Sequence, residues 1–181
     1  MSDDLAWDLL DSQTAYTCPG FDVINETVQL PDGSETDFDY LTESESVVIL
    51  PFTTDGEVVV IEEWREPGKR VNFGLPAGGL ESEDGDTAAA VERELIEETG
   101  YEAGAIRHLT TVEPANGVSD MVFHYFVAED CTATAEQNLD HNESIDVTTA
   151  DFEDLVAAVR EDDLRDGRSA LAILYYHAFE R

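Results

Sequence analysis

Positively charged residues are scarce in this sequence. The 181 residues include 9 Lys and Arg against 42 Asp and Glu, which gives a formal net charge of −33 at pH 7. Lys69 is the only lysine. Nucleic acids and anionic lipid surfaces are bound through clusters of basic residues, so this charge balance argues against nucleic acid and against a membrane as partners.

The acidic residues are spread from Asp3 to Glu180 rather than gathered in one tail. Like charges at this density repel one another and oppose a compact state in dilute buffer, whereas molar salt shortens the screening length to about 3 Å. The sequence therefore predicts a protein adapted to a very salty cytoplasm, that is, one from a halophile.

Cysteines and long apolar runs are also few. Cys18 and Cys131 lie far apart and belong to no CxxC or Cys/His cluster, so neither a disulfide framework nor a zinc site is indicated. The amino terminus, MSDDLAWDLL, lacks the basic segment and apolar stretch of a secretory signal, and no run of about 18 apolar residues occurs. We expect a soluble, cytoplasmic protein with reduced cysteines.

The pattern of strands and helices favours an α/β fold. Two hairpins are predicted, one with FDVINETVQL and TDFDYLTE around PDGS, the other with SVVILPF and EVVVIEEW around TTDG. MVFHYFVAE is a further strand candidate. Helices are expected over DFEDLVAAVRE from Asp151 and over SALAILYYHAFE from Ser169. Strands that lie between helices favour this fold class over an all-β barrel.

A third helix is predicted from Thr87, because TAAAVERELIEET is rich in helix formers and is followed by Gly100. At about 100° per residue, Glu94, Glu97 and Glu98 share an arc beside the apolar stripe of this helix. Like charges at this spacing destabilise a helix unless a cation relieves them. Carboxylate oxygens suit Mg²⁺ or Mn²⁺, which also bind phosphate oxygens of a substrate. The helix is therefore predicted to carry a metal site.

The segment around RELIEETG resembles the Nudix box, G-x5-E-x7-R-E-U-x-E-E-x-G-U, in which U is a bulky apolar residue. The residues that fit are Gly79, Arg93, Glu94, Leu95, Glu97, Glu98 and Gly100, with Tyr101 in the last place. The part R-E-x-x-E-E-x-G should arise by chance roughly once in a thousand chains of this size. The first glutamate of the motif falls at Gly85, which lies between Asp84 and Asp86. Either an aspartate takes its place or that carboxylate is absent.

Segments outside the box resemble the ADP-ribose pyrophosphatase branch of the Nudix family. VQLPDGSETDFDYL resembles the amino-terminal hairpin of that branch, and LPAGG resembles the segment that leads into the box. The resemblance implies that a backbone carbonyl, that of Gly78 or Ala77, binds metal together with Glu94, Glu97 and Glu98.

Three further segments resemble substrate and catalytic regions of the same branch. VVVIEEWREP, ANGVSD and HNESIDV imply that Trp64, Arg65 and Asp120 bind substrate, and that Glu143 is catalytic, with the box residue Glu97 as the other catalytic carboxylate. From the residues alone, Arg65 could instead pair with surface acids, Trp64 could be a packing residue, and Glu143 could be a solvated acid.

The resemblance implies a Nudix-type α/β/α sandwich around a mixed sheet. Residues 1–44 would form an amino-terminal β extension, centred on its hairpin, that supports a homodimer, and residues 45–181 would form the Nudix hydrolase domain. The implied reaction is metal-dependent hydrolysis of a nucleoside diphosphate linked to another group, with ADP-ribose giving AMP and ribose 5-phosphate. Two alternatives stay open: a nucleotide sugar or dinucleoside polyphosphate as the substrate, and a Nudix-fold nucleotide-binding module without catalysis.

Overall fold

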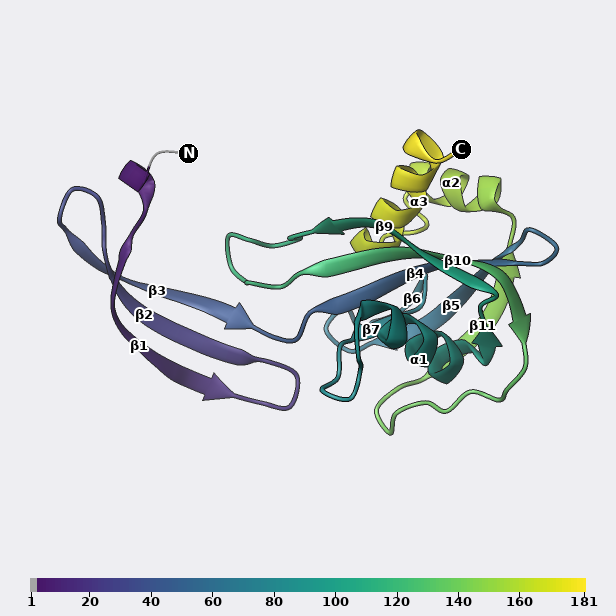
Figure 1. Ribbon diagram of the computed structural model, residues 1–181, viewed down its shortest axis with the longest axis horizontal. Coiled ribbons are helices and arrows are strands. Elements are labelled where there is room, and N and C mark those ends of the chain that lie inside the picture. The colour runs from purple at the N-terminus through teal and green to yellow at the C-terminus, as the bar shows by residue number, and fades with distance from the viewer. Residues whose placement is uncertain (1–2) are drawn as a thin grey trace. The chain divides into compact units, whose positions relative to one another are not determined.

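The computed structural model describes residues 3–181, which divide into two compact units. Unit 1 comprises the chain up to Glu45 together with the segment Glu113–Val122. Unit 2 comprises Ser46–Val112 and Phe123–Arg181. Both units are drawn in Figure 1.

Unit 1 is built on a three-stranded antiparallel sheet in the order β1-β2-β3. Its elements are η1 (Asp3–Leu5), β1 (Asp8–Thr17), β2 (Asp22–Gln29) and β3 (Glu35–Thr42). The first predicted hairpin is confirmed as β2 and β3, with Gly33 in the left-handed conformation at the turn (φ 84°). Strand β1 was not predicted, because every residue in it is exposed and its sequence lacks the alternation of a half-buried strand.

Unit 2 contains an eight-stranded sheet in the order β11-β5-β4-β10-β8, with β6 beside β5, β7 beside β4 and β9 beside β10. The strands are β4 (Ser46–Thr53), β5 (Val58–Arg65), β6 (Arg70–Gly74), β7 (Ala77–Gly79), β8 (Tyr101–Glu102), β9 (Ala105–Val112), β10 (Phe123–Ala133) and β11 (Ile145–Ala150). Strands β4 and β10 run parallel whereas their other neighbours run antiparallel, so the sheet is mixed.

Helices cover both faces of this sheet, as Figure 1 shows. They are α1 (Thr87–Thr99), α2 (Phe152–Arg160) and α3 (Gly167–Phe179). Along β4, Val47 and Ile49 pack in one core cluster with α1, whereas Phe52, on the opposite face, contacts Phe152 of α2 and Tyr176 of α3. The predicted α/β fold around a mixed sheet is confirmed.

All three predicted helices are present, and each begins after an aspartate whose side chain accepts a backbone hydrogen bond: Asp86, Asp151 and Asp166. Helix α3 begins at Gly167, two residues before the predicted start at Ser169. No helix within residues 3–181 is long and apolar enough to cross a membrane.

Candidate active site

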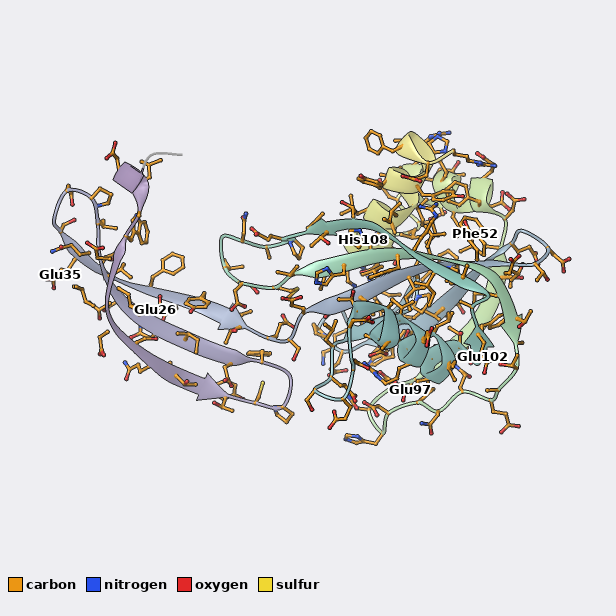
Figure 2. All side chains as sticks on the ribbon, in the orientation of Figure 1. Glu26, Glu35, Phe52, Glu97, Glu102 and His108 are labelled. Carbon is orange, nitrogen blue, oxygen red and sulfur yellow. The ribbon has the colours of Figure 1, made fainter. Side chains whose placement is uncertain are left out.

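Helix α1 places its glutamates at the margin of the core. Val91 and Leu95 are fully buried in the cluster beneath the helix. On the adjoining arc, Glu94 and Glu98 are only 8% and 3% exposed, whereas Glu97, labelled in Figure 2, is partly exposed. The helical spacing therefore buries two carboxylates and leaves the third nearer to solvent.

The buried carboxylates have unusual protonation behaviour. Burial raises the pKa of Glu98 to about 8, and the nearby charge of Glu94 adds to this effect. Burial also raises the pKa of Glu94 to about 7, against the opposing effect of Arg93. The Oε2 atom of Glu98 accepts a hydrogen bond from the backbone N–H of Ala77 at 2.9 Å. The helix is thus tied to β7 through a side chain whose charged form is disfavoured by burial.

Because Gly78 has no side chain, the carboxylate of Glu94 can lie directly against its backbone. A Cβ atom built on Gly78 would lie 2.1 Å from the carboxylate carbon of Glu94, so a larger residue would displace this side chain. The backbone of β7 therefore runs directly against the carboxylate. These donors are all hard oxygens, as the predicted divalent cation site requires.

Arg93 contributes positive charge to the same cluster. Its Nη1 atom lies 2.8 Å from Glu94 Oε1 and 3.2 Å from Glu97 Oε2. With these oxygens turned toward the arginine, no three Asp, Glu, His or Cys side chains in residues 3–181 converge on a single ion-binding point. The residues nevertheless fit a divalent cation, because two buried carboxylates with raised pKa values lie together and one of them lies directly against the backbone of Gly78.

Next to position 85, where the motif has its first glutamate, Asp84 pairs with Arg93. Its carboxylate accepts hydrogen bonds from Arg93 Nε at 3.1 Å and from Arg93 Nη2 at 2.8 Å, and these bonds lower its pKa. The side chain of Asp86 instead caps the amino-terminal end of α1, where it accepts a hydrogen bond from Ala89 N. Asp84 therefore supplies a carboxylate beside the arginine of the motif, one residue before the position at which the motif has glutamate.

Glu143 lies on the loop between β10 and β11, and its charge reaches the helical carboxylates. It contributes to the raised pKa values of Glu94 and Glu98. Its Oε2 atom accepts a hydrogen bond from the backbone N–H of Asp140 at 2.9 Å. The fold thus brings this loop residue near a helix that lies more than forty positions away along the chain.

Arg65 and Trp64 are neighbours on β5, so their side chains point to opposite faces of the sheet. Arg65 Nη2 pairs with Glu63 Oε2 at 2.6 Å, and burial raises the pKa of Glu63 against the effect of this arginine. Trp64 is 47% exposed and donates from Nε1 to Glu66 Oε2 at 2.9 Å. The structure therefore does not place the two predicted substrate residues on one face of the strand.

Two residues near Arg65 were missed by sequence reasoning. Glu63 and Arg168 line a small pocket together with Arg65, and both are distant from the box in sequence. Glu63 could have been found from the alternation along β5, because it shares a face with Arg65. Arg168 lies at the start of α3, and no pattern in the sequence around it indicates that it lies near Arg65.

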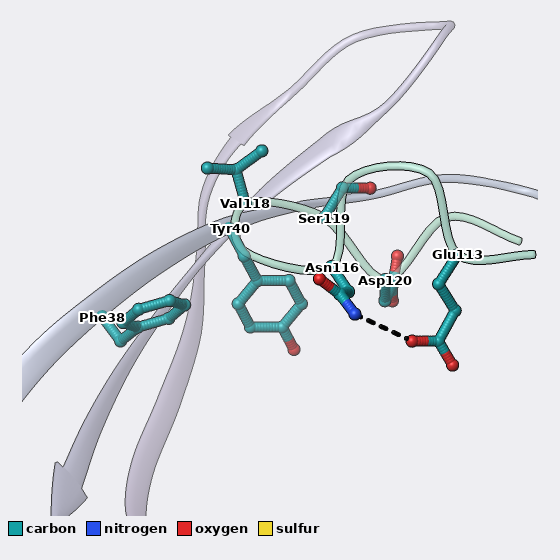
Figure 3. Close-up of a pocket in the computed structure, with 7 residues that line it drawn as sticks. All are labelled: Phe38, Tyr40, Glu113, Asn116, Val118, Ser119 and Asp120. Carbon is teal, nitrogen blue, oxygen red and sulfur yellow. Dashed lines mark hydrogen bonds between the residues drawn. The ribbon is translucent and has the colours of Figure 1, made fainter.

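Asp120 lies in a pocket of unit 1 that has a volume of about 370 Å³ (Figure 3). The pocket is lined by Phe38, Tyr40, Glu113, Asn116, Val118, Ser119 and Asp120. Asp120 Oδ2 accepts a hydrogen bond from Thr42 Oγ1 at 2.7 Å, and Asp120 N donates to Leu41 O at 3.2 Å. Phe38 and Tyr40, which sequence reasoning missed, alternate along β3 and present aromatic surface to this pocket.

Comparison with known proteins agrees with this geometry. The family model described as the NUDIX domain matches residues 43–171, which include the box, Arg65 and Glu143. The chain belongs to the Nudix family. It is 31% identical over 155 residues to the ADP-ribose pyrophosphatase of Bacillus subtilis (strain 168), with 85% of this chain and 83% of that protein covered.

The chain is also 26% identical over 151 residues to the methanol dehydrogenase activator of Bacillus methanolicus, with 83% of this chain and 81% of that protein covered. The fold resembles that of a crystal structure described as an ADP compounds hydrolase, with a TM-score of 0.85, 20% identity and coverage of 97% and 95%. Family and fold together support a Nudix hydrolase that acts on nucleoside diphosphate compounds, as predicted. Nudix hydrolases generally use divalent metal ions.

Proposed function

We propose that this Nudix hydrolase splits the pyrophosphate of ADP-ribose to give AMP and ribose 5-phosphate. The observation that carries the proposal is the burial of Glu94 and Glu98 against β7, beside Arg93 and Glu97. The choice of ADP-ribose is supported by the 31% identical relative, which is named an ADP-ribose pyrophosphatase.

Glu94, Glu97 and Glu98, with the carbonyl of Gly78, would hold Mg²⁺ or Mn²⁺. Such an ion, when bound, neutralises phosphate oxygens and lowers the pKa of an attacking water. The oxygen-only donor set suits these ions, which prefer carboxylates and carbonyls. Arg93 keeps the side chains of Glu94 and Glu97 in place through the contacts of its Nη1 atom.

Proton transfer would fall to a carboxylate outside the buried pair. Glu143 accepts the proton of the attacking water, since its charge already reaches Glu94 and Glu98. Glu97, which is more exposed than Glu94 and Glu98, is the second candidate for this role.

Substrate binding would use Arg65, Trp64 and Asp120. Arg65 pairs with a phosphate through its planar guanidinium, in exchange for part of its contact with Glu63. Trp64 offers an exposed ring to a base or sugar. In unit 1, Asp120 accepts a hydrogen bond from a sugar hydroxyl, and the aromatic surface of its pocket favours a stacked base.

A homodimer formed through residues 1–44 belongs to the same proposal. Large apolar side chains are exposed on this segment, namely Leu5, Trp7, Leu9, Leu10, Tyr16, Phe21 and Phe38. Strand β1 is exposed along its whole length. A second copy of the chain would cover these side chains. Several large apolar residues exposed on one short segment indicate an interaction surface, whereas single exposed apolar residues do not. Sedimentation in molar KCl measures the mass, and a monomer at all concentrations would contradict the dimer.

The proposed setting is the cytoplasm of a halophile. Its support is the net charge of −33 and the two unpaired thiols, Cys18 and Cys131, which suit a reducing compartment. We further expect no binding to nucleic acid. A shift of labelled DNA or RNA by the protein at physiological salt would contradict that expectation.

The decisive experiment is a product assay in molar KCl with Mg²⁺ or Mn²⁺. ADP-ribose, a nucleotide sugar and a dinucleoside polyphosphate are compared, and AMP formation is followed by chromatography. ADP-ribose should have the highest kcat/KM. A higher kcat/KM with another compound would show that the chemistry is pyrophosphate hydrolysis but that the substrate is not ADP-ribose. Binding of ADP-ribose with no turnover of any compound would identify a binding module.

The metal helix is tested with Glu98→Gln. This change preserves size and removes the charge of one buried carboxylate, so kcat should fall by at least about a hundredfold. Glu92→Gln, at an exposed position on the same helix, is the matched control and should retain activity. Near-normal turnover in E98Q would remove the metal site from the proposal.

A further inference from the structure

The loop that carries Glu143 follows β10, and the first residues of this loop are hydrogen-bonded to α1. The backbone N–H groups of Thr134 and Ala135 donate to Gly100 O at 3.0 and 3.1 Å, and Asn138 N donates to Glu97 O at 2.9 Å. These acceptors lie at the carboxyl-terminal end of the helix, where backbone carbonyls lack partners within the helix.

The same loop is attached to the sheet at its end. Trp64 N, on β5, donates to Ser144 O at 3.2 Å. Between the two attachments, a turn is closed by Glu143 N, which donates to Asp140 O at 3.0 Å, and by Asp140 N, which donates to the Glu143 side chain. The position of the Glu143 carboxylate therefore depends on how the two ends of the loop are held relative to each other.

The side chain of Gln137 connects these two ends. Its Nε2 atom donates to Glu98 O at 2.6 Å and also to Ile145 O at 3.3 Å. Glu98 lies in the last turn of α1, and Ile145 is the first residue of β11. A primary amide can supply both hydrogen bonds, because its nitrogen carries two protons. One side chain thus joins the helix of the metal site to the strand that follows Glu143.

We propose that Gln137 is a positioning residue that holds the Glu143 loop against α1 and thereby fixes the position of the Glu143 carboxylate. The inference rests on the proposed function for the role of Glu143. Its physical reason is the steep dependence of proton transfer on geometry, since a displacement of about 1 Å can cost about a hundredfold in rate. Gln137 itself touches neither substrate nor metal in this proposal.

Two substitutions test the connection. Gln137→Leu removes both donors at similar size, and Gln137→Glu replaces them with a charge that repels two carbonyl oxygens. Each should lower kcat by on the order of tenfold to a hundredfold with KM changed by less than about threefold. Gln29→Leu is the matched control, because Gln29 also donates to a backbone carbonyl, that of Gly33, but in unit 1. Unchanged kcat in both Gln137 variants would overturn the proposal.

A double-mutant cycle separates positioning from general stabilisation. If Gln137 acts through Glu143, Q137L should lower kcat by less than about twofold when Glu143→Gln is already present. A loss that multiplies fully with that of E143Q would overturn the proposal. So would an E143Q variant with normal kcat, which would also remove Glu143 from the mechanism while leaving the hydrolase activity itself intact.

Hydrogen exchange provides a readout that does not depend on activity. In Q137L, backbone amides of residues 138–144 should exchange faster, by at least about fivefold, whereas those in the first two turns of α1 should not change. Unaltered exchange in this loop would overturn the inference even if ADP-ribose proved not to be the substrate. Faster exchange would support the attachment independently of which compound is hydrolysed.

Discussion

Asp84 binds the guanidinium of Arg93 with both of its carboxylate oxygens, while Arg93 directs its third nitrogen, Nη1, toward Glu94 and Glu97. Arg93 Nη2 also donates to Gly79 O at 2.8 Å. Arg93, a residue of α1, is therefore held on one side by the segment before the helix, and on the other side it contacts Glu94 and Glu97 of the same helix. Asp84, which lies one residue before the motif position, thus fixes the place of the Arg93 guanidinium beside Glu94 and Glu97.

Replacing Asp84 with Asn should weaken metal binding. The two-point contact with a charged partner is lost, so Arg93 can move toward Glu94 and Glu97 and compete with the cation. We expect the metal concentration needed for half-maximal activity to rise roughly tenfold or more, as for other residues that support metal ligands. A titration with Mg²⁺ or Mn²⁺ measures it. Glu83→Gln, at an exposed position in the same loop, is the control, and equal titrations for both variants would contradict the role of Asp84.

Adjacent glycines should respond differently to alanine. In Gly78→Ala the new methyl group would occupy the place of the Glu94 carboxylate, a flexible side-chain end that can move, so the fold should survive. We expect kcat/KM to fall by on the order of a hundredfold with little change in Tm. Gly79→Ala is the matched control, because nothing lies within 4 Å of a Cβ there. Equal activities of the two variants would show that the space at Gly78 is not needed.

Asp166 should contribute stability that disappears in acid. Burial alone would raise its pKa, but Arg168 and the hydrogen bonds from Ser169 outweigh burial and hold the pKa below the ordinary value of 3.8. A carboxylate with a lowered pKa in the folded state stabilises the fold fully above its unfolded pKa, and this contribution is lost as pH falls through the folded value. Ser169 Oγ in turn accepts from Leu75 N, just before β7.

We therefore expect Asp166→Asn to cost about 1.5 kcal/mol of unfolding free energy near neutral pH, since hydrogen bonds to a charged group are lost. The difference from the unmodified protein should shrink below pH 3.8. Urea unfolding at a series of pH values in molar KCl measures both. Asp163→Asn, at an exposed position, is the control, and a difference that does not change with pH would refute the assignment to this carboxylate.

Stability should rise steeply with ionic strength. The repulsion that accompanies a net charge of −33 is screened over about 10 Å at 0.1 M salt and about 3 Å at 1 M. The midpoint of thermal unfolding should therefore rise continuously between these KCl concentrations, with chelator present to exclude divalent ions. Sucrose, which does not screen charge, should have a much smaller effect. A midpoint that is the same in low and molar KCl would contradict adaptation to salt.

Local patterns predicted the elements that carry the proposed chemistry. The spacing of Glu94, Glu97 and Glu98 placed them on one arc of a helix, and the structure has that helix from Thr87 to Thr99. The Asp-Gly turn predicted the hairpin of β2 and β3, because tight turns depend on a few neighbouring residues. Such predictions succeed where the interactions that decide a conformation lie within one or two turns of chain.

Other features depended on contacts between distant segments. Strand β1 is paired with β2 although its own sequence shows no alternation, because its backbone partner decides its conformation. The pairing of Asp84 with Arg93 depends on the path of the loop, and no count of motif positions could reveal it. Phe38 and Tyr40 line the unit 1 pocket because the segment Glu113–Val122, which is distant in sequence, folds beside β3.

The amino-acid sequence by itself determined the family, the fold class, the helix that carries Glu94, Glu97 and Glu98, and the acidic character of the surface, because periodicity, motif spacing and composition are properties of the chain alone. Only the tertiary structure decided that Glu94 and Glu98 are buried against β7, and that Gln137 joins α1 to β11 beside Glu143. The raised pKa values at the site arise from this burial, and burial is set by how strands and helices that are distant in sequence pack together.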